Sequence, residues 1–121
     1  MSWTQLAIAV LTLSGAAPPL RQDIDFELVN KAGVSFSHVW VIESGAKSWG
    51  QNLIKEPLKD GGSVQIRLAN PDSWQAWDLR VQYSKRDCEQ WRSLEVPQFK
   101  RLTILILPDG RWDAHYEKRN R

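Results

Sequence analysis

Strict alternation of apolar and polar residues is the feature that most restricts how this chain folds. Apolar side chains stand at every second position in 63–68, in 77–83 and in 112–116, with polar side chains between most of them. Successive side chains of a β-strand point to opposite faces of the sheet, so each segment predicts an antiparallel strand with one face in the core and the other in water. No long segment has the periodicity of a helix, and only 49–56 suits one or two helical turns.

Three further strands are predicted at 25–30, 34–43 and 102–107. The first two are separated by 31–33, a length that suits a hairpin. The even positions of the second strand are expected to face the core: Val34, Phe36, Trp40 and Ile42. Val39 and Val41 make its far half apolar on both sides, which predicts a central place in its sheet. The segment 102–107 is apolar at every position but one and is also expected to be central or covered on both faces.

Turn sequences separate several of these strands. They are Asp60-Gly61-Gly62, Asn70-Pro71-Asp72 and Pro108-Asp109-Gly110. Glycine takes positive φ, proline presets φ, and Asp or Asn bonds its own backbone, so each tripeptide favours a chain reversal. At 121 residues the chain forms one domain. The predicted fold is all-β: a single antiparallel β-sandwich of about six to eight strands, immunoglobulin-like or similar, over 23–116, followed by a basic, solvated tail at 117–121.

The first residues differ in composition from the rest. An apolar block at 6–13 is followed by small residues and then by Pro18-Pro19, which predicts a secretory signal peptide over 1–16 and a linker over 17–22. The block is too short to span a bilayer, which needs ~20 apolar residues. The expected location is therefore periplasmic or secreted. Since 1–5 contain no Lys or Arg, two alternatives stay open: a start placed too late, or a buried strand or helix.

Charge and ligand chemistry exclude several classes of function. Sixteen Lys and Arg against fourteen Asp and Glu leave a net charge of +2, which does not favour nucleic acid as a partner. One cysteine and two histidines are too few for a structural zinc site. The acidic turns lack the dense oxygen ligands of a calcium loop. No metal and no cofactor are therefore expected.

Cys88 is the one thiol, so no disulfide forms within the chain. The cations Lys85 and Arg86 precede it, and neighbouring cations lower the pKa of a thiol, but no histidine is close in sequence. No serine-nucleophile elbow, phosphate loop or dinucleotide motif is present. The sequence therefore predicts a protein that is not an enzyme, with Cys88 as a free thiol in or beside a strand.

Seven tryptophans make the chain tryptophan-rich. Four of them, Trp40, Trp77, Trp91 and Trp112, fall at or near inward positions and are expected in the core. The candidates for ligand or partner binding lie in loops: Trp49, Trp74 and Asn52. Loop aromatics stack on sugar rings or enter a partner's pocket, and they also fold back over the open end of a sandwich. Because Trp49 follows an apolar strand and precedes Leu53-Ile54, the second role is favoured for it.

Several segments occur in an order that points to a family. They are Phe26-Glu27-Leu28-Val29-Asn30 with Gly33, Ser48-Trp49-Gly50 with Leu53-Ile54, Ser63-Val64-Gln65-Ile66, Trp77-Asp78-Leu79-Arg80-Val81-Gln82-Tyr83 and Gln90-Trp91-Arg92-Ser93-Leu94. Over 25–107 the chain resembles a family of small, mostly uncharacterised exported bacterial β proteins. The resemblance implies export and a sandwich-like domain, and no catalytic residue. Some members carry an argininosuccinate-lyase label, but such a lyase is a large, mainly helical oligomer.

The chain departs from that family at two positions. Members often carry a cysteine pair where Gln75 and Pro97 stand here, so the implied disulfide is missing. The predicted function is a non-catalytic, exported binding or interaction module, with an envelope protein or a glycan as partner. The sequence does not indicate an oligomeric state. The alternatives are an inhibitor of an envelope enzyme, a glycan-binding module that uses Trp49 and Trp74, and a small hydrolase.

Overall fold

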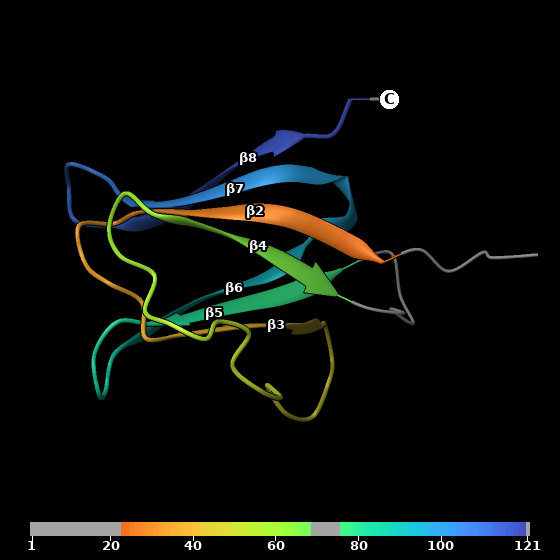
Figure 1. The fold of residues 1–121 in the computed structure, drawn as a ribbon, viewed down its shortest axis with the longest axis horizontal. Helices are drawn as coiled ribbons and strands as arrows, with labels where there is room; N and C mark the ends of the chain where they lie inside the picture. The colour runs from red at the N-terminus through yellow and green to blue at the C-terminus, as the bar shows by residue number, and fades with distance from the viewer. Residues whose placement is uncertain (1–22, 69–75, 121) are drawn as a thin grey trace, which may run out of the picture.

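The computed structural model describes residues 23–68 and 76–120, which form two β-sheets packed face to face (Figure 1). The elements in chain order are β2 (Ile24–Lys31), β3 (His38–Glu43), β4 (Ser63–Leu68), β5 (Trp77–Gln82), β6 (Cys88–Leu94), the 3₁₀ turn η2 (Val96–Gln98), β7 (Phe99–Ile106) and β8 (Trp112–Lys118). Within these residues no helix is long and apolar enough to cross a membrane. The segments expected to be a signal peptide and a linker lie outside the described residues.

The sandwich pairs a four-stranded sheet, ordered β4-β2-β7-β8, with a three-stranded sheet, ordered β3-β5-β6. The predicted all-β sandwich is confirmed, with one difference: β2 and β7 run parallel, with Leu28 opposite Leu102, whereas every other strand pair is antiparallel. Parallel neighbours need a long crossover connection. Here the chain leaves β2, builds the three-stranded sheet and β4, and returns to β2 as β7 (Figure 1).

Alternate side chains of the strands fill the space between the sheets. In β2 they are Ile24, Phe26 and Leu28, all at most 2% exposed, and in β7 they include Leu102 and Ile104. Full burial of such a side chain stabilises the fold by ~1.5–3 kcal/mol. β7 lies between β2 and β8, which confirms the central strand predicted at 102–107.

The predicted hairpin between 25–30 and 34–43 is wrong, because β2 and β3 lie in different sheets. The buried side chain of Asn30 redirects the chain after β2: its Nδ2 donates to the carbonyl oxygens of Val34 (2.7 Å) and Leu58 (2.9 Å). Its Oδ1 accepts the Ala32 N–H at 2.9 Å. These bonds hold the connection that leads from one sheet to the other. A hairpin would instead have kept both strands in one sheet.

The predicted orientation of the second strand is also wrong. Val39 and Val41 are buried in the core, whereas Trp40 and Ile42 are half-buried on the outer face of the sheet. Phe36 is buried as expected, but a bend at Ser37, before β3 begins, reverses the alternation, so that odd positions of β3 face the core. β3 is an edge strand, and its free edge is closed by the segment 52–53, whose Leu53 N–H donates to Val39 O at 2.8 Å. No helix forms over 49–56.

The last strand runs two residues beyond the expected end of the domain. β8 continues to Lys118, and within it Glu117 is ion-paired to Arg101 on β7. The Arg119 N–H then donates to Gln98 O at 2.9 Å. Part of the expected basic tail is therefore tied to the sheet.

Candidate functional site

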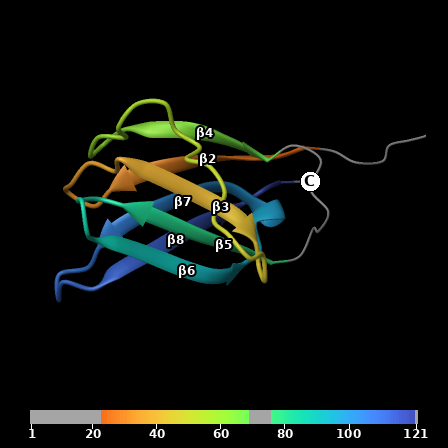
Figure 2. The same cartoon turned by 90° about the horizontal axis from the view of Figure 1, so that it is seen from below.

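The outer face of the three-stranded sheet carries an unusual set of side chains for a solvent-facing surface. Two rows cross β3, β5 and β6: His38, Gln82 and Cys88 in one, and Trp40, Arg80 and Gln90 in the other. The loop 44–54 passes over part of this surface (Figure 2). We call these six residues together with Trp49 the aromatic face.

Arg80 lies at the centre of the aromatic face, in contact with two indole rings. Its guanidinium carbon is 5.2 Å from the centre of the Trp40 ring and 5.6 Å from that of Trp49. His38 stacks on Trp40, with ring centres 5.2 Å apart and planes 16° from parallel. A cation over an aromatic face is stabilised by ~0.5–2 kcal/mol, more as water is removed. The stack therefore links β3, β5 and the loop through one arginine.

No carboxylate in the described residues pairs with Arg80, although the side chain is half-buried. Its Nη2 donates to Cys88 Sγ at 3.4 Å, and its Nε is buried without a hydrogen-bond partner. Contact with an aromatic ring does not use up the N–H groups of a guanidinium, which can donate to other acceptors. Arg80 thus keeps donor capacity that the described residues do not fill.

Asp78, next along the same face of β5, is satisfied from within. It is 3% exposed. Its Oδ1 accepts the Ser44 hydroxyl at 2.7 Å and the Ser93 N–H at 3.0 Å, and Arg92 Nη1 donates to Oδ2 at 3.3 Å. Ser93 has φ of 59° at the irregular pairing of β5 with β6. The carboxylate therefore holds both the start of the loop 44–54 and the bulge in β6.

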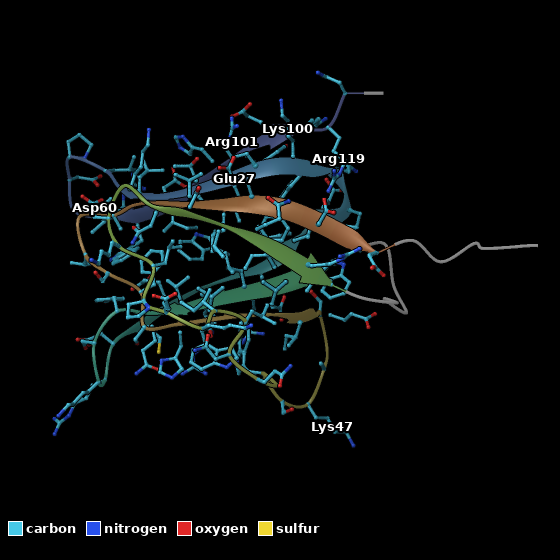
Figure 3. All side chains as sticks on the ribbon, viewed as in Figure 1. Glu27, Lys47, Asp60, Lys100, Arg101 and Arg119 are labelled. Atoms are coloured by element: carbon cyan, nitrogen blue, oxygen red, sulfur yellow. The ribbon has the colours of Figure 1, made fainter. Side chains whose placement is uncertain are left out.

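A cavity of about 250 Å³ lies between the loop and the sheet. Its lining includes Ile42, Asp78, Arg92 and the loop residues from Gly45 to Trp49. Lys47 stands at the tip of that loop with its ammonium directed away from the sheet (Figure 3). The cavity adjoins the Arg80 stack because Trp49 contributes to both.

The structure describes two of the three loop residues predicted as binding candidates, and these two have different contacts. Trp49 is half-buried on the outer face against Arg80, whereas Ile54, which follows in the same loop, is buried in the core. Trp49 thus covers an outer face of the sandwich and not its open end. Asn52 Oδ1 accepts the Val39 N–H at 2.9 Å, so this side chain caps the edge of β3. Trp74 lies outside the described residues.

Cys88 is half-buried at the start of β6, with Arg80 as its hydrogen-bond partner. His38 shares its row but is separated from it by β5, which is a spacing of about 10 Å between the strands. His38 Nδ1 is 2.9 Å from Ser37 Oγ. His115 is on the other sheet, with its Nε2 2.9 Å from Asp113 Oδ2. In the described residues no three His, Cys, Asp or Glu side chains gather as a metal site.

The outer face of the four-stranded sheet has a different chemistry. Arg101 Nε is 2.6 Å from Glu27 Oε1, and Arg101 also pairs with Glu117 (Figure 3). Further pairs join Arg67 to Asp23 and Arg119 to Asp25. The Arg101 guanidinium lowers the pKa of Glu27, assisted by a hydrogen bond from Ser63. Opposite charges are matched across this face, which we call the charged face.

A second hollow, of about 680 Å³, lies between the edge strands β6 and β8. Its apolar lining includes Leu94, Phe99, Leu102 and Tyr116, and Tyr116 is 51% exposed. The four-stranded sheet extends one strand further than its partner sheet, so the inner face of β8 is left partly uncovered. Nothing in the described residues indicates what would cover it.

Comparison of the chain with protein-family models, with curated proteins and with solved structures gave no match. The site therefore has to be interpreted from its own chemistry. The sequence alone did not single out three residues of this surface as binding candidates: Trp40, His38 and Arg80. The outward position of Arg80 in 77–83 could have indicated this surface. The prediction for Trp40 places it in the core, because all residues over 39–42 are apolar and alternation cannot tell the two faces apart there.

Proposed function

We propose that this chain is a non-catalytic binding module and that the aromatic face is its binding surface. The observation that carries the proposal is the half-buried Arg80, which contacts Trp40 and Trp49 and pairs with no carboxylate of the described residues. Tryptophan and arginine are the residue types that most often dominate binding energy at interfaces. Here they form one continuous surface that also includes the amides of Gln82 and Gln90.

The contacts of Cys88 support a binding role over thiol catalysis. A nucleophilic thiol needs a base within hydrogen-bond reach, at ~2.6–3.2 Å. The thiol instead accepts a hydrogen bond from Arg80, a group that stays protonated and cannot act as a base. In this proposal Cys88 is a structural neighbour of Arg80 and takes no part in chemistry.

The proposed setting is the cell envelope or the extracellular medium, with an envelope protein or a glycan as partner. The apolar segment 6–13 and the small residues after it support export. N-terminal sequencing of the protein isolated from cells tests this directly. Cleavage after Ala16 gives Ala17 as the first residue, and an intact Met1 would contradict export by this route.

Affinity capture from an envelope fraction tests the binding surface. Immobilised wild-type protein is compared with Trp49→Ala and Arg80→Gln on the aromatic face and with Arg101→Gln on the charged face. We expect capture of one set of components to fall about tenfold or more in the first two variants, since hot-spot residues contribute ~2 kcal/mol or more. Arg101→Gln should retain capture. Thermal unfolding of each variant identifies any loss that comes from unfolding.

The opposite pattern would contradict the proposal. If Arg101→Gln abolished capture while the two aromatic-face variants kept it, the binding surface would lie on the charged face. If folded Trp49→Ala and Arg80→Gln proteins captured as much as wild type, Trp49 would serve only to hold the loop on the sheet.

A further inference from the structure

The ligand of the aromatic face can be narrowed from the charges and shape of that surface. We infer that it is an acidic glycan, a saccharide whose carboxylate is bound by the guanidinium of Arg80. The inference rests on the proposed function and goes beyond it by naming the class of ligand. It is carried by three properties of the face: an unmatched cation, amide groups beside it, and a strand edge that the loop already occupies at Val39.

The first property is the unmatched charge. Among the residues at the outward positions of β3, β5 and β6, only Asp78 is a carboxylate, and it already accepts three hydrogen bonds. Arg80 has no such partner, whereas Arg92, which lines the cavity beside Trp49, is paired with Asp78. A guanidinium binds a carboxylate through two parallel N–H groups in its plane. Its contacts with Trp40 and Trp49 hold the guanidinium against two indole rings.

The second property is the set of neutral polar groups around Arg80. Gln90 is exposed and lies directly opposite Arg80 on β6. Gln82 Nε2 donates to Ser84 O at 2.9 Å, which leaves its carbonyl oxygen as an acceptor. Amides both donate to and accept from hydroxyl groups, which a saccharide carries on every ring. The indole of Trp49 offers a flat apolar surface for the C–H face of such a ring.

The third property concerns shape and argues against a peptide. An extended peptide that binds a sheet pairs with a free strand edge. The edge of β3 that lies beside the loop is already occupied at Val39, whose N–H donates to Asn52 Oδ1 and whose carbonyl oxygen accepts the Leu53 N–H. The cavity of about 250 Å³ beside Trp49 is also smaller than the ~300–1,000 Å³ of drug-sized sites. It suits one ring of a longer chain that lies across the face.

Single-stranded nucleic acid would use the same kind of aromatic stacking, but it also needs a groove of cations that follows the phosphates. The outward residues of β3, β5 and β6 supply Arg80 and Arg92, and Arg92 is engaged by Asp78. This arrangement fits one carboxylate at a time better than a continuous row of phosphates. An oligonucleotide is therefore the matched competitor in the test.

The test is isothermal titration of the full chain with defined oligosaccharides. The probes are uronic-acid and sialic-acid oligosaccharides, each paired with its methyl ester, which keeps the shape and removes the charge. We expect binding of at least one acid form and about 10- to 100-fold weaker binding of its ester, in line with the loss of a charge-assisted bond. Arg80→Gln should lose the preference for the acid, whereas Arg101→Gln should keep it.

A conservative variant protects the test against unfolding. Arg80→Lys keeps the positive charge and loses the planar pair of donors, so it should retain a reduced preference for the acid form. Thermal unfolding of both Arg80 variants establishes that they are folded. A folded Arg80→Lys or Arg80→Gln protein with the wild-type preference would overturn the role of Arg80.

The remaining outcomes distinguish this inference from the proposed function. Equal binding of acid and ester forms would overturn carboxylate recognition and leave the binding module standing. Binding of a glutamate-rich peptide or an oligothymidylate, without any acid oligosaccharide, would overturn the glycan class. If no probe bound while capture from the envelope fraction still depended on Trp49, the glycan class would also be overturned and the binding module would stand. No binding and no such capture would overturn both.

Discussion

The two outer faces of the sandwich differ in how they treat charge. On the charged face, Glu27, Arg101 and Glu117 form a connected set of ion pairs that spans β2, β7 and β8. On the aromatic face, Arg80 is half-buried between indole rings and pairs with no carboxylate of the described residues. Exposed ion pairs contribute ~0–1 kcal/mol each and serve mainly solubility. Removing a cation from water costs free energy unless it is paired and hydrogen-bonded.

The two faces differ in their capacity to bind a charged ligand. Charges that are already matched gain little from a new partner, because the partner would have to replace an existing ion pair. Arg80 has in-plane donors to offer and neighbours that hold it in place. We therefore propose that the charged face serves solvation and the aromatic face serves recognition, and the following predictions test this proposal.

The largest effect on stability is expected at Asp78, the buried carboxylate beside the aromatic face. Asp78→Ala removes the acceptor of the Ser44 hydroxyl and of the Ser93 N–H. A hydrogen bond to a charged group contributes ~1.5–3 kcal/mol, so losing the carboxylate should lower the free energy of unfolding by about 2–4 kcal/mol. Urea denaturation measures it. Asp25→Ala on the charged face is the matched control and should change it by less than ~1 kcal/mol. Similar losses in both would remove the distinction between the faces.

An intermediate effect is expected when the loop loses its contact with Arg80. Trp49→Ala removes one of the two cation–aromatic contacts, which is worth ~0.5–2 kcal/mol. The amides of 44–51 should exchange with deuterium faster, while those of β2 and β7 should not change. Exchange rates that stay as in the wild type across 44–51 would mean that Asp78 and Ser44 hold the loop without Trp49.

The smallest effect concerns the pH dependence of the charged face. Because Arg101 lowers the pKa of Glu27, ionised Glu27 stabilises the fold above its ordinary pKa of 4.5, and this contribution is lost as the pH falls through the lower folded value. Carboxyl chemical shifts should report a Glu27 pKa below 4.5 in the wild type. Arg101→Gln should return it toward that value. An unchanged pKa in this variant would show that the ion pair does not form in solution.

The strands could largely be predicted from the sequence, and their pairing could not. Alternation in 63–68 and 77–83 is a local property, and both became strands. The course of the chain after β2 depends on Asn30 reaching the carbonyl of Leu58, which is far along the sequence. No local pattern indicates such a bond, so a hairpin was the natural prediction.

The candidate site was predicted only in part, for a related reason. Trp49 was identified, but its partner was expected among the core residues. Over 39–42 the residues on both faces of β3 are apolar. The smaller side chains of Val39 and Val41 fill the core, and the larger Trp40 lies on the outer face. Which set faces inward depends on the bend at Ser37 and on the facing sheet. The contact of Trp49 with Arg80 joins a loop to a distant strand, so spacing along the chain cannot indicate it.

The most direct test of the central claim is to map the ligand's footprint by NMR. The full chain, labelled with ¹⁵N, is titrated with the acid oligosaccharide that binds most tightly. The account predicts that the largest shifts fall on the indole N–H groups of Trp40 and Trp49 and on the Arg80 Nε–H, with none on the outward residues of β2 and β8. Shifts concentrated on the charged face, or in the hollow between β6 and β8, would contradict it.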